Sequence, residues 1–304
     1  MSRVAAIDCG TNSIRLLIAD ISGEKFTEVL RDMEIVRLGQ GVDQSKSFHS
    51  DAIDRTLLAV EKFKGLLAGK GVEKIRFCAT SATRDAINRQ LFIDGVRKIL
   101  GVEVEVIPGN EEARLSFNGA TKELTPNDAP FLVVDIGGGS TEFVFGKSEV
   151  EFAISVDIGC VRMSERHLKT QPAQSDQLAQ AIIDIDKAIA KAAAQVPISS
   201  AKSLVAVAGT ATTIAAAALN LKTYDRDEIH LSRISAQEVH KVAATFQSMS
   251  KDEIAQLGFM HPGRVDVITA GSLILSRIMA ATGASEFVAS ESDILDGMAW
   301  SLIN

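Results

Sequence analysis

The sequence predicts an α/β protein built from two similar domains. Its 304 residues are enough for two domains of ordinary size. Short apolar segments alternate with longer segments of helical periodicity, which favours α/β layers with a parallel component. A segment around Asp8 recurs around Asp135, 127 positions later, so the two halves share one design.

The first half begins with an expected hairpin over residues 3–21. A start signal at Ser50 predicts a helix whose apolar positions 53, 57, 60 and 63 have helical spacing, and which ends near Gly69. The further elements expected in this half are a strand over 74–79 that runs into a helix start at 80–85, and a strand over 102–107 that runs into 108–114.

The second half repeats this plan. We expect a hairpin over 131–145, a strand over 152–158, a long helix from Ser175 to Pro197, and a strand over 203–208 that delivers 209–213 to a helix. Capping boxes at Ser235 and Ser250, each with a Glu three positions later, predict two more helix starts.

The polar, proline-bearing stretch 125–130 is the expected domain boundary. We therefore predict a first domain over 1–126 that also includes about 288–304, and a second domain over 127–287. The last helix, about 290–304, is expected to cross back to the first domain.

The two repeated segments have the design of phosphate-binding turns. In each, an apolar run ends in Asp, and one apolar residue, a Gly and small hydroxyl or amide residues follow. Glycine lets the backbone approach an anion closely, N–H groups can point at that anion, and the Asp can hold a cation or a water. A single Asp-x-Gly turn is more simply explained as a tight hairpin. Two copies of one design favour phosphate binding.

The turn after Asp135 carries three consecutive glycines, Gly137 to Gly139, followed by Ser140. Glycines cost backbone entropy without adding packing, so a ligand that approaches the backbone explains them better than structure alone. Glu142 lies seven positions after Asp135, across the turn. The two carboxylates could face one divalent cation that takes oxygen ligands and keeps several waters.

Three other places are candidates for the same chemistry. Residues 209–213 bring N–H groups and hydroxyls to a helix start, which is equally well explained as a capped helix. Arg84 follows a strand and could pair with phosphate through two bonds, and Arg15 and Arg264 are weaker candidates. The paired acids Glu111 and Glu112 suit either a helix dipole or a general base.

Charge and composition exclude several classes of function. The net charge of −7, the lack of a Lys/Arg block and the 15 aromatic residues argue against a nucleic-acid partner. No apolar run is long enough to cross a bilayer, so we expect a cytoplasmic protein with no membrane partner. The scattered Cys9, Cys78 and Cys160 are interpreted as reduced core thiols, with Cys9 a small filler rather than a nucleophile.

Five motifs in order give the chain a family resemblance. They lie at 8–15, 79–84, 109–114, 135–142 and 209–213. Together they resemble the exopolyphosphatase/guanosine pentaphosphate phosphatase family, within the actin/sugar-kinase/Hsp70-like superfamily. The resemblance covers nearly the whole chain, and it implies two ribonuclease-H-like domains that face an interdomain cleft.

The resemblance also implies a reaction and residue roles. The reaction is removal of the terminal phosphate from inorganic polyphosphate, or alternatively from pppGpp, with Mg²⁺ or Mn²⁺. Glu112 is implied as the base that activates water, with Arg84 and Glu142 as further catalytic groups. The implied metal ligands are Asp135, Glu142 and Asp8. The implied phosphate-binding residues are Asn12, Ser13, Arg15, Gly137, Gly138, Gly139, Ser140 and Arg264.

Two departures from the family pattern shape further expectations. Residues 292–297 differ from the ending familiar in the family, so no site is assigned there. The length resembles the short two-domain form without a C-terminal helical domain. With the charge of −7, this leads us to expect a preference for short polyphosphates. The resemblance further implies a homodimer.

Two rival functions stay open at this point. One is a kinase of the same fold, which would need nucleotide recognition and exclusion of water. The other is a non-catalytic pppGpp or polyphosphate sensor, or an actin-like assembling protein. The presence of Glu112 together with the Asp135 and Glu142 pair favours catalysis, because a sensor needs no base.

Overall fold

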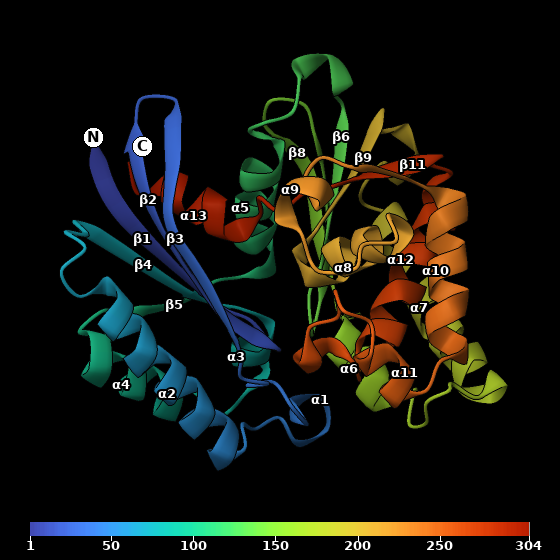
Figure 1. Ribbon diagram of the computed structural model, residues 1–304, viewed down its shortest axis with the longest axis horizontal. Helices are drawn as coiled ribbons and strands as arrows, with labels where there is room; N and C mark the ends of the chain where they lie inside the picture. Colours follow the sequence, from blue (N-terminus) through green and yellow to red (C-terminus); the bar gives the residue numbers. More distant parts are fainter. Residues whose placement is uncertain (304) are drawn as a thin grey trace. The chain divides into compact units, whose positions relative to one another are not determined.

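The computed structural model describes residues 1–303, and the chain forms two compact units (Figure 1). Unit 1 comprises Met1–Gly119 and Ile294–Asn304, and unit 2 comprises Ala120–Asp293. The C-terminal segment thus returns to unit 1 from residue 294, whereas the sequence placed this return at about 288. The reason is β11 (Glu286–Ala289), which pairs with strands of unit 2.

Unit 1 contains a five-stranded mixed sheet in the order β3-β2-β1-β4-β5. Its strands are β1 (Ser2–Cys9), β2 (Ser13–Ser22), β3 (Lys25–Ile35), β4 (Lys74–Ala79) and β5 (Val104–Val106). The first three form an antiparallel meander, while β4 pairs parallel to β1 and β5 pairs parallel to β4. The hairpin expected over 3–21 and the strand expected over 74–79 are confirmed.

Both faces of this sheet are covered, which explains the continuous apolar run of β1. Alternate residues face opposite ways, so Ile7 packs under α2 (Ser50–Leu67) and α4 (Arg89–Leu100). Val4 and Ala6 pack under α5 (Gly109–Thr121) and α13 (Ile294–Ser301). Figure 1 shows α2 beside α4, and α13 beside α5.

Unit 2 contains a six-stranded mixed sheet in the order β10-β11-β9-β6-β7-β8. Besides β11, its strands are β6 (Phe131–Ile136), β7 (Thr141–Gly146), β8 (Val150–Val156), β9 (Ser203–Val207) and β10 (Arg233–Ser235). Again three strands form an antiparallel meander, and the following strands β9 and β11 extend it in parallel. The shared order of five strands shows that the two units repeat one plan.

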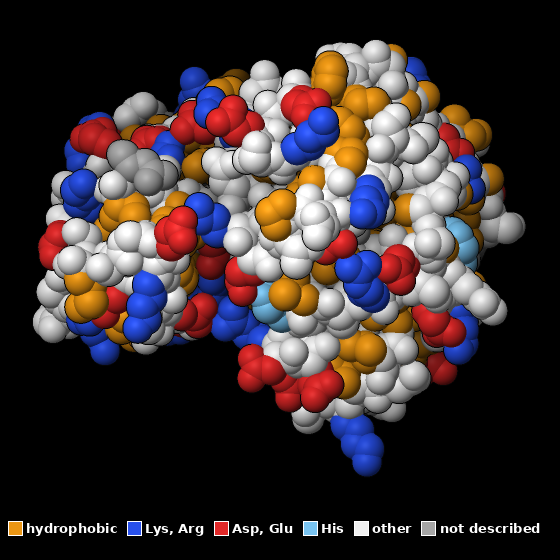
Figure 2. Space-filling model, turned by 90° about the horizontal axis from the view of Figure 1, so that it is seen from above, with side chains coloured by type: hydrophobic (Ala, Val, Ile, Leu, Met, Phe, Trp, Pro, Cys, Tyr) orange, Lys and Arg blue, Asp and Glu red, His pale blue; other side chains and the backbone are white. Residues whose placement is uncertain are grey.

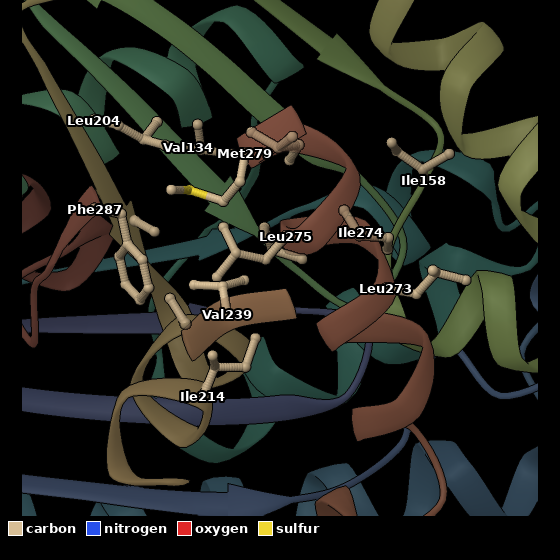
Figure 3. Packing of buried hydrophobic residues seen from close by; sticks show 14 of the residues in the cluster. Val134, Ile158, Leu204, Ile214, Val239, Leu273, Ile274, Leu275, Met279 and Phe287 are labelled. Carbon is tan, nitrogen blue, oxygen red and sulfur yellow. The ribbon is translucent and has the colours of Figure 1, made fainter. Parts of the chain in front are cut away.

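The main core of unit 2 lies between one face of its sheet and a layer of helices (Figure 3). Val134 of β6, Leu204 of β9 and Phe287 of β11 point into it from the sheet. The helices of unit 2 are α6 (Cys160–Arg166), α7 (Ser175–Ala193), α8 (Ala208–Ala218), α9 (Arg226–Ile229), α10 (Ala236–Ser248), α11 (Lys251–Ala255) and α12 (Ile268–Thr282).

The remaining helical segments are short. They are α1 (Val42–Ser45), α3 (Ser81–Asp85) and the 3-10 turns η1 (Pro126–Asp128), η2 (Ile198–Ser200) and η3 (Pro262–Arg264). Within residues 1–303, no helix is long and apolar enough to span a bilayer.

The predicted helix starts differ in how they are capped. Ser250 forms a full capping box with Glu253, and the Ser235 side chain accepts from the N–H of Glu238. Ser175 is the first residue of α7, and the cap position is Gln174, which caps with no side-chain hydrogen bond.

Candidate active site

The β1–β2 turn of unit 1 is closed by a hydrogen bond from the N–H of Gly10 to the carbonyl of Ser13, at 2.9 Å. Asp8 and Arg15 lie opposite each other in the strand register that leads into this turn. The Arg15 guanidinium bonds the Asp8 carboxylate at 2.7 Å, and Asp8 is buried. Asp8 and Arg15, which the sequence assigned to a metal and to phosphate, therefore neutralise each other in part.

The β6–β7 turn of unit 2 has the same geometry with different chemistry. The N–H of Gly137 donates to the carbonyl of Ser140 at 3.0 Å, and Asp135 lies opposite Glu142 in the register. Glu142 thus occupies the place that Arg15 has in unit 1. Both carboxylates are buried, with 6% and 1% of their residues exposed, and Ser155 Oγ donates to Glu142 at 2.6 Å.

This pair of acids fits a divalent cation. Two carboxylates held side by side and away from water repel each other, and a cation between them offsets that repulsion. Oxygen donors are what Mg²⁺ takes, and it keeps most of its water when only one or two carboxylates bind it. Within residues 1–303, no cluster of three or more His, Cys, Asp or Glu side chains could hold a metal. Two carboxylates as the protein donors suit a partly hydrated ion rather than a protein cage.

The carbonyl groups of the glycine turn are all engaged on one side by the start of α6. The N–H of Cys160 donates to the carbonyl of Gly137, and the N–H groups of Val161 and Arg162 donate to that of Gly138. The Arg162 side chain donates from Nε to the carbonyl of Gly139 at 2.6 Å. Helix N–H groups that lack a partner within the helix are thereby satisfied.

This engagement sets the direction of three N–H groups. In a trans peptide the C=O and the next N–H point in opposite directions. Because three successive carbonyls are held toward α6, the N–H groups of Gly138, Gly139 and Ser140 are directed away from it. None of these three has an acceptor within hydrogen-bond range in residues 1–303. Successive N–H groups that converge in this way form an anion-binding concavity.

The turn of unit 1 is supported by the same device. The N–H of Gly39 donates to the carbonyl of Thr11 at 2.8 Å, and the N–H groups of residues 36 and 37 donate to that of Asn12. A Cβ at Gly39 would lie 2.3 Å from the Thr11 side chain, so this close support requires glycine. Ser13 begins β2 beyond the turn. Asn12 and Ser13 thus belong to a second turn of the same construction.

Glu112 lies in the first turn of α5 and is buried, with 8% of the residue exposed. Arg84 donates to its carboxylate at 2.7 Å and to the carbonyl of Ile107 at 3.0 Å. Burial raises the pKa of the Glu112 carboxyl, and the nearby Asp8 raises it as well. Arg84 and the hydroxyl of Thr80 act in the opposite direction. The result is an oriented carboxylate with a raised pKa, which suits a general base.

The neighbouring Glu111 has a different environment. It pairs with Arg76 at 2.5 Å, and 41% of its side chain is exposed. Arg76 also binds Glu105, so this group is a surface ion-pair network. The structure thus separates the two adjacent acids, which the sequence left as alternatives for the base.

Arg264 is the last residue of η3, and its side chain lies against the start of α8 in unit 2. It donates to the Thr213 hydroxyl at 3.1 Å, and its guanidinium lies over Gly209, where a Cβ would approach it to 2.2 Å. The residues expected over 209–213 therefore do open a helix, with an arginine against its first turn. This places positive charge beside backbone N–H groups.

The three cysteines are buried and free. Burial raises the pKa of the Cys9 thiol well above its ordinary value, and it raises the pKa of Cys160 to about 11. Thiols of this kind stay protonated at neutral pH and are poor nucleophiles.

Lysine and arginine side chains are interspersed with acidic ones on the face shown in Figure 2.

Sequence reasoning missed three residues that shape these sites: Thr80, Ser155 and Arg162. Thr80 precedes the predicted Arg84 in a hydroxyl-rich stretch, which was a usable signal. Ser155 and Arg162 lie in an ordinary strand and an ordinary short helix, and only the fold brings them to the β6–β7 turn.

Known proteins resemble this chain over nearly its whole length. Residues 17–303 match the Ppx/GppA phosphatase family. The chain is 43% identical to Exopolyphosphatase 2 of Mycobacterium tuberculosis, over 99% of each protein. It is 41% identical to an exopolyphosphatase-like protein of known crystal structure, with a TM-score of 0.97 over 99% of this chain and 97% of that one. A match at 35% identity to the guanosine-5'-triphosphate,3'-diphosphate pyrophosphatase of Photobacterium profundum covers 54% of this chain and 33% of that protein. The chain belongs to the Ppx/GppA phosphatase family.

Proposed function

We propose that this protein is an exopolyphosphatase that hydrolyses the terminal phosphate of inorganic polyphosphate, with short chains preferred. The observation that carries the proposal is the row of N–H groups of Gly138, Gly139 and Ser140, directed away from α6 beside the Asp135 and Glu142 pair. Membership of the family makes the chain a hydrolase of phosphoanhydride bonds, and a full-length relative bears the name exopolyphosphatase.

The chemistry of phosphoryl transfer fits this construction. Such transfer depends on positioning and on neutralisation of charge on the phosphoryl oxygens rather than on covalent chemistry. The three N–H groups hold those oxygens without reorganisation, because α6 fixes their direction beforehand. Mg²⁺ held by Asp135 and Glu142 would supply further neutralisation.

Glu112 is the proposed base that takes the proton of the attacking water. A base is most effective when its pKa lies near the working pH, and burial moves the pKa of Glu112 upward in that direction. Arg84 fixes the carboxylate, and it keeps the charged form accessible by opposing the effect of burial. The ion pair of Asp8 and Arg15 supports their turn. The expected roles of Asp8 with the metal and of Arg15 with phosphate stay predictions.

Glu112→Gln tests the base, with Glu111→Gln as the matched control. We expect Glu112→Gln to lower kcat for phosphate release from short polyphosphate by at least about 100-fold, a typical contribution of general base catalysis. The Glu112→Gln variant should still bind the polyphosphate. Glu111→Gln should retain turnover close to the unmodified protein, because Glu111 lies in the surface network with Arg76. The opposite ranking of the two variants would assign the base to Glu111.

Hydrolysis of pppGpp is the second candidate, favoured by the partial match to the pyrophosphatase of Photobacterium profundum. Both substrates end in the same phosphoanhydride, so the same turn serves either. Specificity constants for short polyphosphate, long polyphosphate, pppGpp and ATP, measured side by side, rank them. Binding of these anions without phosphate release, with either Mg²⁺ or Mn²⁺, would instead identify a sensor.

The homodimer and the cytoplasmic location stay predictions. Light scattering of the purified protein over a range of concentrations checks the first. Three buried thiols without a disulfide support the second, because reducing compartments keep cysteines in this form.

A further inference from the structure

Arg162 is a charged side chain in an almost fully buried place, with 7% of the residue exposed. Burial of an arginine is costly unless its donors are used, so such a residue needs a specific partner. One such partner is the Gly139 carbonyl, which accepts from Nε at 2.6 Å. That carbonyl belongs to the same peptide group as the N–H of Ser140.

The start of α6 holds the other two carbonyls with its backbone alone. Its first three N–H groups are used on Gly137 and Gly138. At Gly159, a Cβ would lie 2.4 Å from the carbonyl of Gly138 and 2.5 Å from the nitrogen of Gly139, so the helix already begins in direct contact with the turn. The carbonyl of Gly139 is held by a side chain instead.

We propose that Arg162 is a positioning residue that fixes the Gly139–Ser140 peptide group so that the Ser140 N–H is presented to the transferring phosphate. The proposal rests on the proposed function. A glycine flanks this peptide group, and glycine adopts both signs of φ readily, so the group can flip when nothing holds its carbonyl. A flipped group would place a carbonyl oxygen, in place of a donor, toward an anion.

The expected consequence is a loss of transition-state stabilisation. Removal of one donor to a developing oxyanion costs roughly 100- to 1000-fold in kcat. Without Arg162 the peptide group still spends part of its time in the productive orientation. We therefore expect Arg162→Met to lower kcat roughly 10- to 100-fold, which is a smaller loss than removal of the donor itself would cause. KM should change much less, since the other two N–H groups remain.

Four variants of the full chain test this. Arg162→Met keeps the stem length, Arg162→Lys keeps the charge, and Arg162→Ala opens space for added guanidinium ion. Ser164→Ala is the matched control, because Ser164 lies in the same helix, is buried, and has a hydroxyl without a partner in residues 1–303. Circular dichroism and melting temperature are recorded for each, with kcat, KM and the Kd for orthovanadate as the probe.

We expect Arg162→Met to have a lower kcat and to bind vanadate more weakly. Arg162→Lys should recover part of the kcat and part of the vanadate affinity. Added guanidinium ion should restore the kcat of Arg162→Ala. Ser164→Ala should match the unmodified protein. If Arg162→Met retains kcat and vanadate affinity, or loses them only in proportion to unfolding, the proposal is overturned. If the unmodified protein releases no phosphate, the proposed function fails by itself, and the vanadate affinities still decide the role of Arg162.

Discussion

At the scale of single residues, one exchange distinguishes the two repeated turns. Asp8 and Asp135 occupy matching positions, but the residue opposite is Arg15 in one turn and Glu142 in the other. The first carboxylate is neutralised in part by the guanidinium of Arg15, whereas the second lies opposite another acid. Two turns of one backbone design therefore carry different charges, with an acid opposite an arginine in the first and an acid opposite an acid in the second.

The protonation of Glu112 should set how the activity depends on pH at the acidic end of the profile. The Thr80 hydroxyl lowers the pKa of Glu112, so Thr80→Val should raise it further. Catalysis needs the ionised form, and a higher pKa delays ionisation to higher pH. We expect the acidic limb of the kcat/KM profile to move to higher pH, with activity recovered well above the new midpoint.

Thr83→Val is the control for that experiment. Thr83 is also buried in the same stretch, but its hydroxyl has no partner in residues 1–303. Its replacement should leave the acidic limb unchanged. An equal displacement in both variants would show that packing, rather than the hydroxyl of Thr80, sets the pKa.

At the scale of elements, the sequence was most informative where composition is unusual. The two turns stand out because Asp and Gly interrupt apolar runs. The expected strand over 74–79 agrees with β4. β3 was missed because it is an edge strand with only partly buried, mostly polar residues, and so shows no apolar run. Which of two adjacent acids is buried depends on how α5 docks on its sheet, and no local pattern encodes that.

The contact between α6 and the glycine turn gives a prediction at this scale. A Cβ at Gly159 would overlap the backbone of Gly138, so Gly159→Ala should displace α6 from the turn and lower both kcat and the melting temperature. Gly65, in α2, has open space around it. Gly65→Ala should therefore stabilise the protein by about 0.5–1 kcal/mol, the usual gain in a helix interior. Thermal and urea unfolding measure both, and a stabilising Gly159→Ala would contradict the close contact.

At the scale of the whole molecule, the chain repeats one plan twice. The order β3-β2-β1-β4-β5 of unit 1 corresponds to β8-β7-β6-β9-β11 of unit 2, and each repeated turn joins the two matching strands β1–β2 and β6–β7. The sequence indicated this duplication through the two turns and through the repeated order of the expected strands and helices. The expectation that the two domains face one phosphate chain stays a prediction, because a repeated motif specifies each domain and not their arrangement.

The net charge of the protein predicts how its specificity constant depends on the length of the polyphosphate. With −7 at neutral pH, the protein repels a long polyanion as a whole, and attraction depends on focused sites. The specificity constant per chain end should therefore be lower for long than for short polyphosphate at low ionic strength. Salt screens charges beyond about 10 Å at 0.1 M, so the two constants should converge as salt is added. Phosphate release at fixed free Mg²⁺ measures both. A preference for long chains that weakens with salt would instead indicate a basic track along which the polymer binds.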